Sequence, residues 1–253
     1  AISQHAGRPP VVAAGGMNSR VTCYYLSGAH DVCASFHVRD GDGVTGVALL
    51  WLQHDRLKVV AGTFSGVVVG WDVGISPLIE DDGNSFRSRR RSTSARRGTF
   101  GVRGEARLPL LPGVADELST SHPEARVRFP GGGAVHAISA SCRRLRGGAT
   151  ADAAPELLVV GGKALELELI LASVGAPPAA ASAVPPLTLL PFATVPYPSS
   201  VRSVSVDDAA SLLAVAGDAG TVEVWALEWN GDVTAPPRVG RTPVHSRPYN
   251  RVV

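Results

Sequence analysis

The residues that could do chemistry are scattered along the chain. The seven histidines form no His-Glu-x-x-His pair and no His/Cys cluster with metal-ligand spacing. No Gly-x-Ser-x-Gly turn presents a serine nucleophile. Ser121-His122 and Asp207-Asp208 are neighbours in sequence alone, and the second pair is typical of a turn between strands. We therefore expect no catalytic residue, no metal ligand, no cofactor and no small-molecule substrate.

Two other patterns could hold ions. A Walker loop needs Gly-x-x-x-x-Gly-Lys-Ser/Thr, but Leu157 occupies the first glycine position before Gly162-Lys163, and Ala164 follows the lysine. The glycines therefore indicate tight β-turns. The acidic run Glu80-Asp81-Asp82 could bind a cation, although a solvated loop beside an arginine run is the simpler interpretation.

The arginine run FRSRRRSTSARRG, residues 86–98, contains six arginines and no acid. Removing these charges changes the formal net charge from +2 to −4, so a broad nucleic-acid-binding face is not expected on the rest of the chain. Three interpretations stay open: a solvated loop, a docking element for acidic protein or RNA, and a kinase site at Ser92. The partner or phosphorylation candidates are Arg89, Arg90, Arg91, Ser92, Arg96 and Arg97.

Cysteine usage and hydropathy bear on the compartment. Cys23, Cys33 and Cys142 are odd in number and widely spaced, which favours a reducing compartment, either cytoplasm or nucleus. The uncharged run Val59–Trp71 is thirteen residues long, shorter than the roughly 20 residues that a membrane helix needs. Its glycines and valines favour a strand. We therefore expect an intracellular protein without a membrane segment.

A repeated strand–turn–strand pattern organises the chain. It occurs in VVAAGGMNSRVTCYY, VVAGTFSGVVVGWD and LAVAGDAGTVEVWA, and more loosely in PELLVVGGKALELELILAS. VTGVA, VHAIS and VRSVS predict a strand before three of these hairpins. The candidates for a following strand are DVCASFHV, then EARLPLL or ARVRF, then LTLLPFATV, then PPRVGRTPV. When the copies are aligned on Gly15, Gly62 and Ala216, aromatic residues stand nine positions later at Tyr24, Trp71 and Trp225.

This four-stranded unit resembles the repeat of the WD-repeat β-propeller family, with Trp71-Asp72 as the namesake pair. Tyr24-Tyr25 and Trp225-Ala226 are degenerate versions of that pair. Family members usually join a His, a Ser/Thr, a turn Asp and the Trp by buried hydrogen bonds. The resemblance implies His37, Thr63 and Trp71 for three of these roles, while Ser65 takes the place of the turn acid.

The resemblance implies an all-β fold, a β-propeller of about four antiparallel four-stranded blades over residues 1–253. The expected blades are approximately 9–38, 44–112, 134–196 and 200–245, with an Arg-rich insertion at 76–104 and the start of a further strand at 245–253. Rings of this family usually close with seven blades, because open strand edges need partners. We expect part of such a ring; the alternative is a small ring whose first blade is completed by Arg251–Val253.

The function implied by the resemblance is a non-catalytic protein–protein interaction scaffold, a subunit of a larger complex. The first alternative is contact with RNA or a ribonucleoprotein through the Arg-rich loop. The second is a propeller enzyme, which needs convergent carboxylates or histidines at a central channel.

Overall fold

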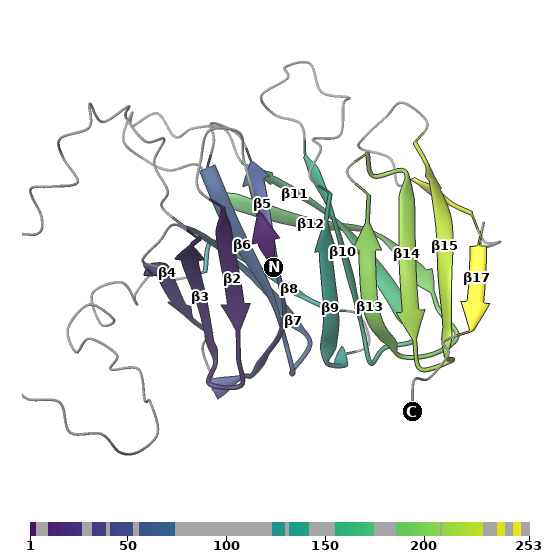
Figure 1. Cartoon of the computed structure of the whole chain (residues 1–253), viewed down its shortest axis with the longest axis horizontal. Helices are drawn as coiled ribbons and strands as arrows, with labels where there is room; N and C mark the ends of the chain where they lie inside the picture. Colours follow the sequence, from purple (N-terminus) through teal and green to yellow (C-terminus); the bar gives the residue numbers. More distant parts are fainter. Residues whose placement is uncertain are drawn as a thin grey trace, which may run out of the picture.

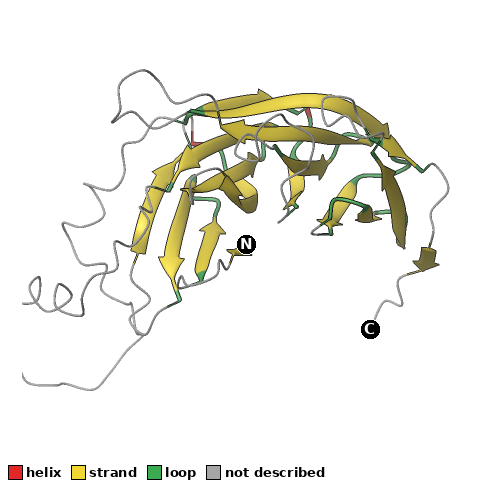
Figure 2. Cartoon of the chain, turned by 90° about the horizontal axis from the view of Figure 1, so that it is seen from above, coloured by secondary structure: helices red, strands yellow, loops and turns green. Residues whose placement is uncertain are grey.

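The part of the chain that the structure describes forms four antiparallel β-sheets that follow one another in sequence order along an arc (Figures 1 and 2). The computed structural model describes residues 1–3, 10–26, 32–38, 41–52, 56–73, 123–129, 132–141, 155–174, 186–207, 209–229, 237–240 and 245–248. These ranges contain strands and turns but no α-helix. Accordingly, they include no helix with the length and apolar character needed to cross a bilayer.

Each sheet is built from strands that are consecutive in sequence. The first contains β1 (Ile2–Ser3), β2 (Val11–Gly15), β3 (Arg20–Tyr25) and β4 (Val32–His37). The second contains β5 (Val44–Leu52), β6 (Arg56–Thr63), β7 (Val67–Asp72) and β8 (Ala125–Arg128). The third contains β9 (Val135–Ala140), β10 (Glu156–Gly162), β11 (Glu166–Val174) and β12 (Leu187–Pro196). The fourth contains β13 (Val201–Val206), β14 (Leu212–Gly217), β15 (Thr221–Glu228), β16 (Arg238–Val239) and β17 (His245–Pro248).

The repeated strand architecture is confirmed. The four hairpins predicted from the repeat are β2–β3, β6–β7, β10–β11 and β14–β15, and the predicted preceding strands are β5, β9 and β13. Of the two candidates for the last strand of the second sheet, ARVRF forms β8, so this sheet extends to Arg128 rather than ending near residue 112. ARVRF suits an edge because its valine packs inward and its arginines are exposed.

Two sheet ends differ from expectation. Ile2–Ser3 pairs with Val11–Val12, so the first sheet starts before residue 9. His245–Pro248 pairs with Thr221–Val224 of β15 and is therefore not the start of a further first strand. The short β16 pairs only with Leu227 and Glu228. The rest of that edge of β15 has backbone N–H and C=O groups that β16 does not pair. These groups explain why β17 pairs with β15. Arg251–Val253 lies outside the described residues.

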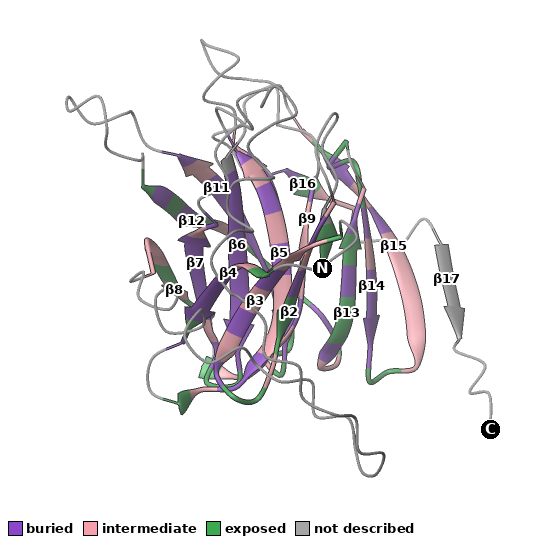
Figure 3. Ribbon diagram, turned by 60° about the vertical axis from the view of Figure 1, so that its left-hand side comes forward, coloured by how far each residue is buried: buried purple, intermediate pink, exposed green. Residues whose placement is uncertain are grey.

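Apolar layers fill the spaces between successive sheets, and Figure 3 marks the buried residues along the strands. Between the first and second sheets, Phe36 stacks on Trp71 with ring centroids 5.4 Å apart. Successive side chains of β11 point to opposite faces of the sheet and so pack in two layers. Leu167, Leu169 and Leu171 face the fourth sheet, while Ile170 faces the second.

The repeated glycine of the hairpins has a packing role. In three sheets the valine that begins the next sheet's first strand packs against this glycine. A Cβ added to the glycine would lie closer than 3.0 Å to that valine. The pairs are Gly15–Val44, Gly62–Val135 and Gly161–Val201. Real Cβ atoms essentially never come so close, so glycine at this position sets how closely successive sheets approach.

A buried ion cluster joins the second sheet to the third. The fully buried Lys58 Nζ lies 2.8 Å from Glu124 Oε2 and 3.2 Å from Asp72 Oδ2. The backbone N–H of Leu187 in β12 donates to the same Glu124 oxygen at 3.0 Å. Asp72, the acid of the Trp-Asp pair, thus takes part in an ion cluster.

The buried Glu168 of β11 makes stability depend on pH. Burial raises the pKa of its carboxyl, although the Thr194 hydroxyl, which donates to Oε2 at 3.0 Å, opposes this rise. The folded state therefore favours the protonated acid, and stability present below the unfolded pKa of about 4.3 is lost as pH rises through the folded pKa. We expect Glu168→Gln to stabilise the protein at pH 7 and to change little near pH 3.5, as measured by urea unfolding. Glu228→Gln at the exposed end of β15 is the control, and an equal gain from Glu168→Gln at both pH values would contradict this account.

Candidate functional site

Four of the site residues expected from the sequence lie in the second sheet. Thr63, Ser65, Trp71 and Asp72 belong to β6, β7 and the turn between them. The aromatic equivalents lie in other sheets: Tyr24 is half-buried in β3, and Trp225 is buried in β15 against Tyr197. The arginine-run candidates Arg89, Arg90, Arg91, Ser92, Arg96 and Arg97 lie outside the described residues.

The structure brings Thr63 and Ser65 together with an acid that the sequence analysis missed. Thr63 Oγ1 lies 3.3 Å from Ser65 Oγ and accepts a hydrogen bond from the Val67 N–H at 3.0 Å. The Ser65 N–H donates to Asp42 Oδ1 at 3.1 Å, and its hydroxyl donates to Asp42 Oδ2. Asp42 comes from the loop just before β5, so the acid reaches the turn from outside the hairpin. The sequence Gly41-Asp42-Gly43 at that junction was the available signal.

The expected link from His37 through Thr63 to Trp71 is not formed. His37 is exposed at the end of β4, and no hydrogen bond within the described ranges joins it to Thr63 or Trp71. Strand alternation is the reason, because it turns Phe36, not His37, toward the Trp71 ring. The Trp71 Nε1–H is buried and has no acceptor among the described residues. By contrast, the indoles of Trp225 and Trp229 donate to Glu223 and the Ala210 carbonyl.

The hairpin turns and the segments leading into the next first strands share one end of the arc, the lower end in Figure 1. We call this end the turn face; it comprises residues 16–19, 41–43, 64–66, 132–134, 163–165, 198–200 and 218–220. Backbone hydrogen bonds join its parts: Val44 N–H to Gly16 O at 3.1 Å, Phe64 N–H to Gly43 O at 2.9 Å, Lys163 N–H to Ala134 O at 2.8 Å and Asp218 N–H to Ser200 O at 2.9 Å. The first of these bonds joins the second sheet to the turn of the first, and the other three each hold a hairpin turn against the segment that precedes the first strand of its own sheet.

Three successive turns each expose a large apolar side chain on the turn face. Met17 is 71 % exposed, and Phe64 and Leu165 are each 60 % exposed. Met17 packs over Gly43, where an added Cβ would lie 2.7 Å from the sulfur. A single exposed apolar residue needs no explanation, but its repetition on three neighbouring turns makes the turn face a candidate binding surface.

A polar hollow of about 330 Å³ lies beside these turns. Its lining includes Thr45, His136 and Arg202, each at the irregular second residue of a first strand: β5, β9 or β13. Arg202 Nε lies 2.6 Å from Asp218 Oδ1. Burial lowers the pKa of His136, and the nearby Arg202 guanidinium lowers it further. The imidazole is therefore neutral at pH 7 and available for hydrogen bonding.

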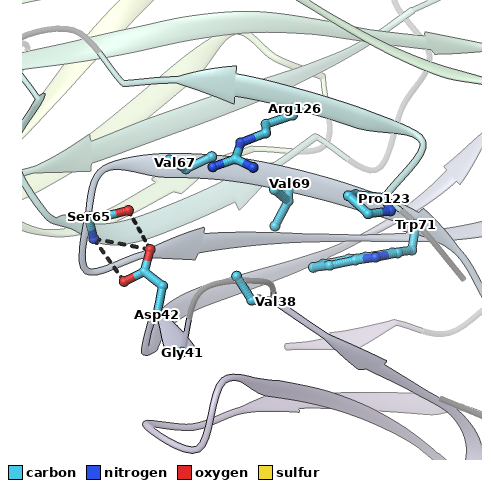
Figure 4. Close-up of a pocket in the computed structure, with 9 residues that line it drawn as sticks. All are labelled: Val38, Gly41, Asp42, Ser65, Val67, Val69, Trp71, Pro123 and Arg126. Atoms are coloured by element: carbon cyan, nitrogen blue, oxygen red, sulfur yellow. Dashed lines mark hydrogen bonds between the residues drawn. The ribbon is translucent and has the colours of Figure 1, made fainter. Parts of the chain in front are cut away.

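A second hollow, of about 290 Å³, lies between β8 and the loop before β5 (Figure 4). Asp42 and Ser65 stand at one end, Trp71 lies toward the other, and Arg126 extends over Val67 and Val69. Arg128 lines an adjoining hollow with Ser65, Val67 and Arg126.

No protein-family model matches the chain, and no curated protein matches it in sequence. Within the described ranges, no three His, Cys, Asp or Glu residues gather in a way that could hold a metal ion. What the turn face offers is exposed apolar side chains beside two hollows with hydrogen-bonding and charged groups.

Proposed function

We propose that this protein is a non-catalytic interaction scaffold, a subunit of a larger protein complex, which binds its partner through the turn face. The four sequential sheets support the proposal that they are blades of a WD-type β-propeller. Their inter-sheet packing gives a rigid support, so that partner contacts made by the turns need little ordering on binding.

The exposure of Met17, Phe64 and Leu165 on successive turns carries this proposal. Each side chain comes from a different sheet, and backbone hydrogen bonds hold the Phe64 and Leu165 turns against the segments that precede β5 and β9. Apolar anchors surrounded by polar groups are the usual arrangement at the centre of a protein interface.

The test begins with photo-crosslinking in cells from a benzoyl-phenylalanine placed at Phe64, which identifies the protein bound there. This partner is then purified separately, and its affinity for the original protein and for variants is measured. We expect the variant Met17→Ser/Phe64→Ser/Leu165→Ser to bind this partner at least about tenfold more weakly, because losing interface anchors typically costs more than 1 kcal/mol each.

The matched control is Leu26→Ser/Leu190→Ser/Leu212→Ser, which removes exposed leucines outside the turn face. It should bind within about twofold of the original protein. Equal weakening by both triple variants, or full affinity of the turn-face variant, would overturn the proposal.

A further inference from the structure

We propose that the hollow between β8 and the loop before β5 binds an acidic segment of the partner, whose carboxylates are held by Arg126 and the indole N–H of Trp71 in this hollow and by Arg128 in the adjoining one. The inference rests on the proposed function and specifies the chemistry of the partner. The site is continuous with the turn face through Ser65, which follows Phe64 and lines both hollows beside β8.

The arginines supply positive charge on one face of an edge strand. Arg126 and Arg128 of β8 pair with Val69 and Val67 of the neighbouring β7. The two arginines are two residues apart on one strand, so both side chains point to the same side of the sheet. Both are exposed, and no carboxylate of the described residues forms an ion pair with either. The acid nearest to them in the hollow, Asp42, already accepts hydrogen bonds from Ser65.

Trp71 supplies a donor without an acceptor. Its side chain is fully buried and lines the hollow, and its Nε1–H makes no hydrogen bond within the described ranges. A buried N–H without a partner costs about 1–3 kcal/mol, so an incoming acceptor gains by binding it. A carboxylate has two oxygens and can accept from an indole and a guanidinium together.

The lining favours an acidic peptide over a nucleic acid. Val38, Val67 and Val69 provide aliphatic surface for neighbouring side chains of a peptide. The Trp71 ring is covered by Phe36 and cannot stack with a base. The Asp42 carboxylate would repel a continuous phosphate backbone, whereas one carboxylate of a peptide can lie beside the arginines and away from it.

The experiment uses the full chain and a fluorescein-labelled peptide that alternates glutamate with valine. We expect Arg126→Gln/Arg128→Gln to weaken binding at least about tenfold, since hydrogen bonds to charged groups are among the strongest. The same peptide with glutamine in place of glutamate should bind equally weakly. Addition of the acidic peptide should shift the Trp71 indole resonance in an NMR spectrum, assigned with Trp71→Phe.

The matched control, Arg20→Gln/Arg238→Gln, removes the same charge from β3 and β16 and should bind within about twofold of the original protein. Equal weakening by this control, an indole resonance that does not move, or preferential binding of a single-stranded oligonucleotide would each overturn the inference. If the acidic peptide does not bind but the partner still needs Met17, Phe64 and Leu165, this inference fails while the proposed function stands. If the peptide binds but the turn-face variant keeps full affinity for its partner, the proposed function fails instead.

Discussion

Replacing Lys58 by methionine should lower the free energy of unfolding by about 3–5 kcal/mol, as is usual when one member of a buried ion cluster is removed. The ammonium group lies between the carboxylates of Asp72 and Glu124, and methionine of similar length leaves both acids facing each other without their cation. Urea unfolding at pH 7 measures the loss. Because β12 is bonded to Glu124, the defect should affect contacts between the second and third sheets.

Lys163 is the chain's other lysine and provides the control. It is exposed in the β10–β11 turn, so Lys163→Met should change the free energy of unfolding by no more than about 0.5 kcal/mol. The triple variant Lys58→Met/Asp72→Asn/Glu124→Gln should recover part of the loss, because no uncompensated charge remains. A Lys58→Met variant as stable as Lys163→Met would show that the cluster does not stabilise the fold.

Gly62→Ala should lower the free energy of unfolding by about 3 kcal/mol, the upper part of the range for overpacking a core. The new methyl group would meet Val135, with Ile138 close behind it, at the point where the third sheet packs on the second. Val135→Ala creates space for that methyl group. We therefore expect the double variant Gly62→Ala/Val135→Ala to lose less free energy of unfolding than the two single variants together, by about 1 kcal/mol or more.

Gly46→Ala is the matched control, because an added Cβ there would make an ordinary contact, 3.4 Å from Ile138. Its loss should be well below that of Gly62→Ala in the same unfolding measurement. Strict additivity of Gly62→Ala and Val135→Ala would contradict a direct contact between the two positions.

The repeat predicted the hairpins because strand, turn and strand are encoded by neighbouring residues. Gly62 and Trp71 could be aligned with their counterparts from spacing alone. The packing role of Gly62 could not be predicted from spacing, because it depends on Val135 in a different sheet. The last strand of the second sheet was ambiguous for a similar reason: β8 follows β7 only after a long connection, and two segments satisfied its pattern.

The candidate site was harder to predict than the fold. His37 was the histidine expected in the network, but strand alternation places its neighbour Phe36 against Trp71. Asp42 was missed because an acid was expected inside the turn. Exposed Met17, Phe64 and Leu165 carry no motif; they form a series only because the sheets align their turns at one end.

The packing of each hairpin glycine against the valine of the following sheet makes the protein a nearest-neighbour array. In such an array, stability is the sum of each unit's own contribution and its contacts with adjacent units. The second and third sheets each have two neighbours, whereas the first and fourth are packed on one side among the described residues. Amide hydrogens of β6 and β10 should therefore exchange most slowly, and local opening should begin at the two outer sheets.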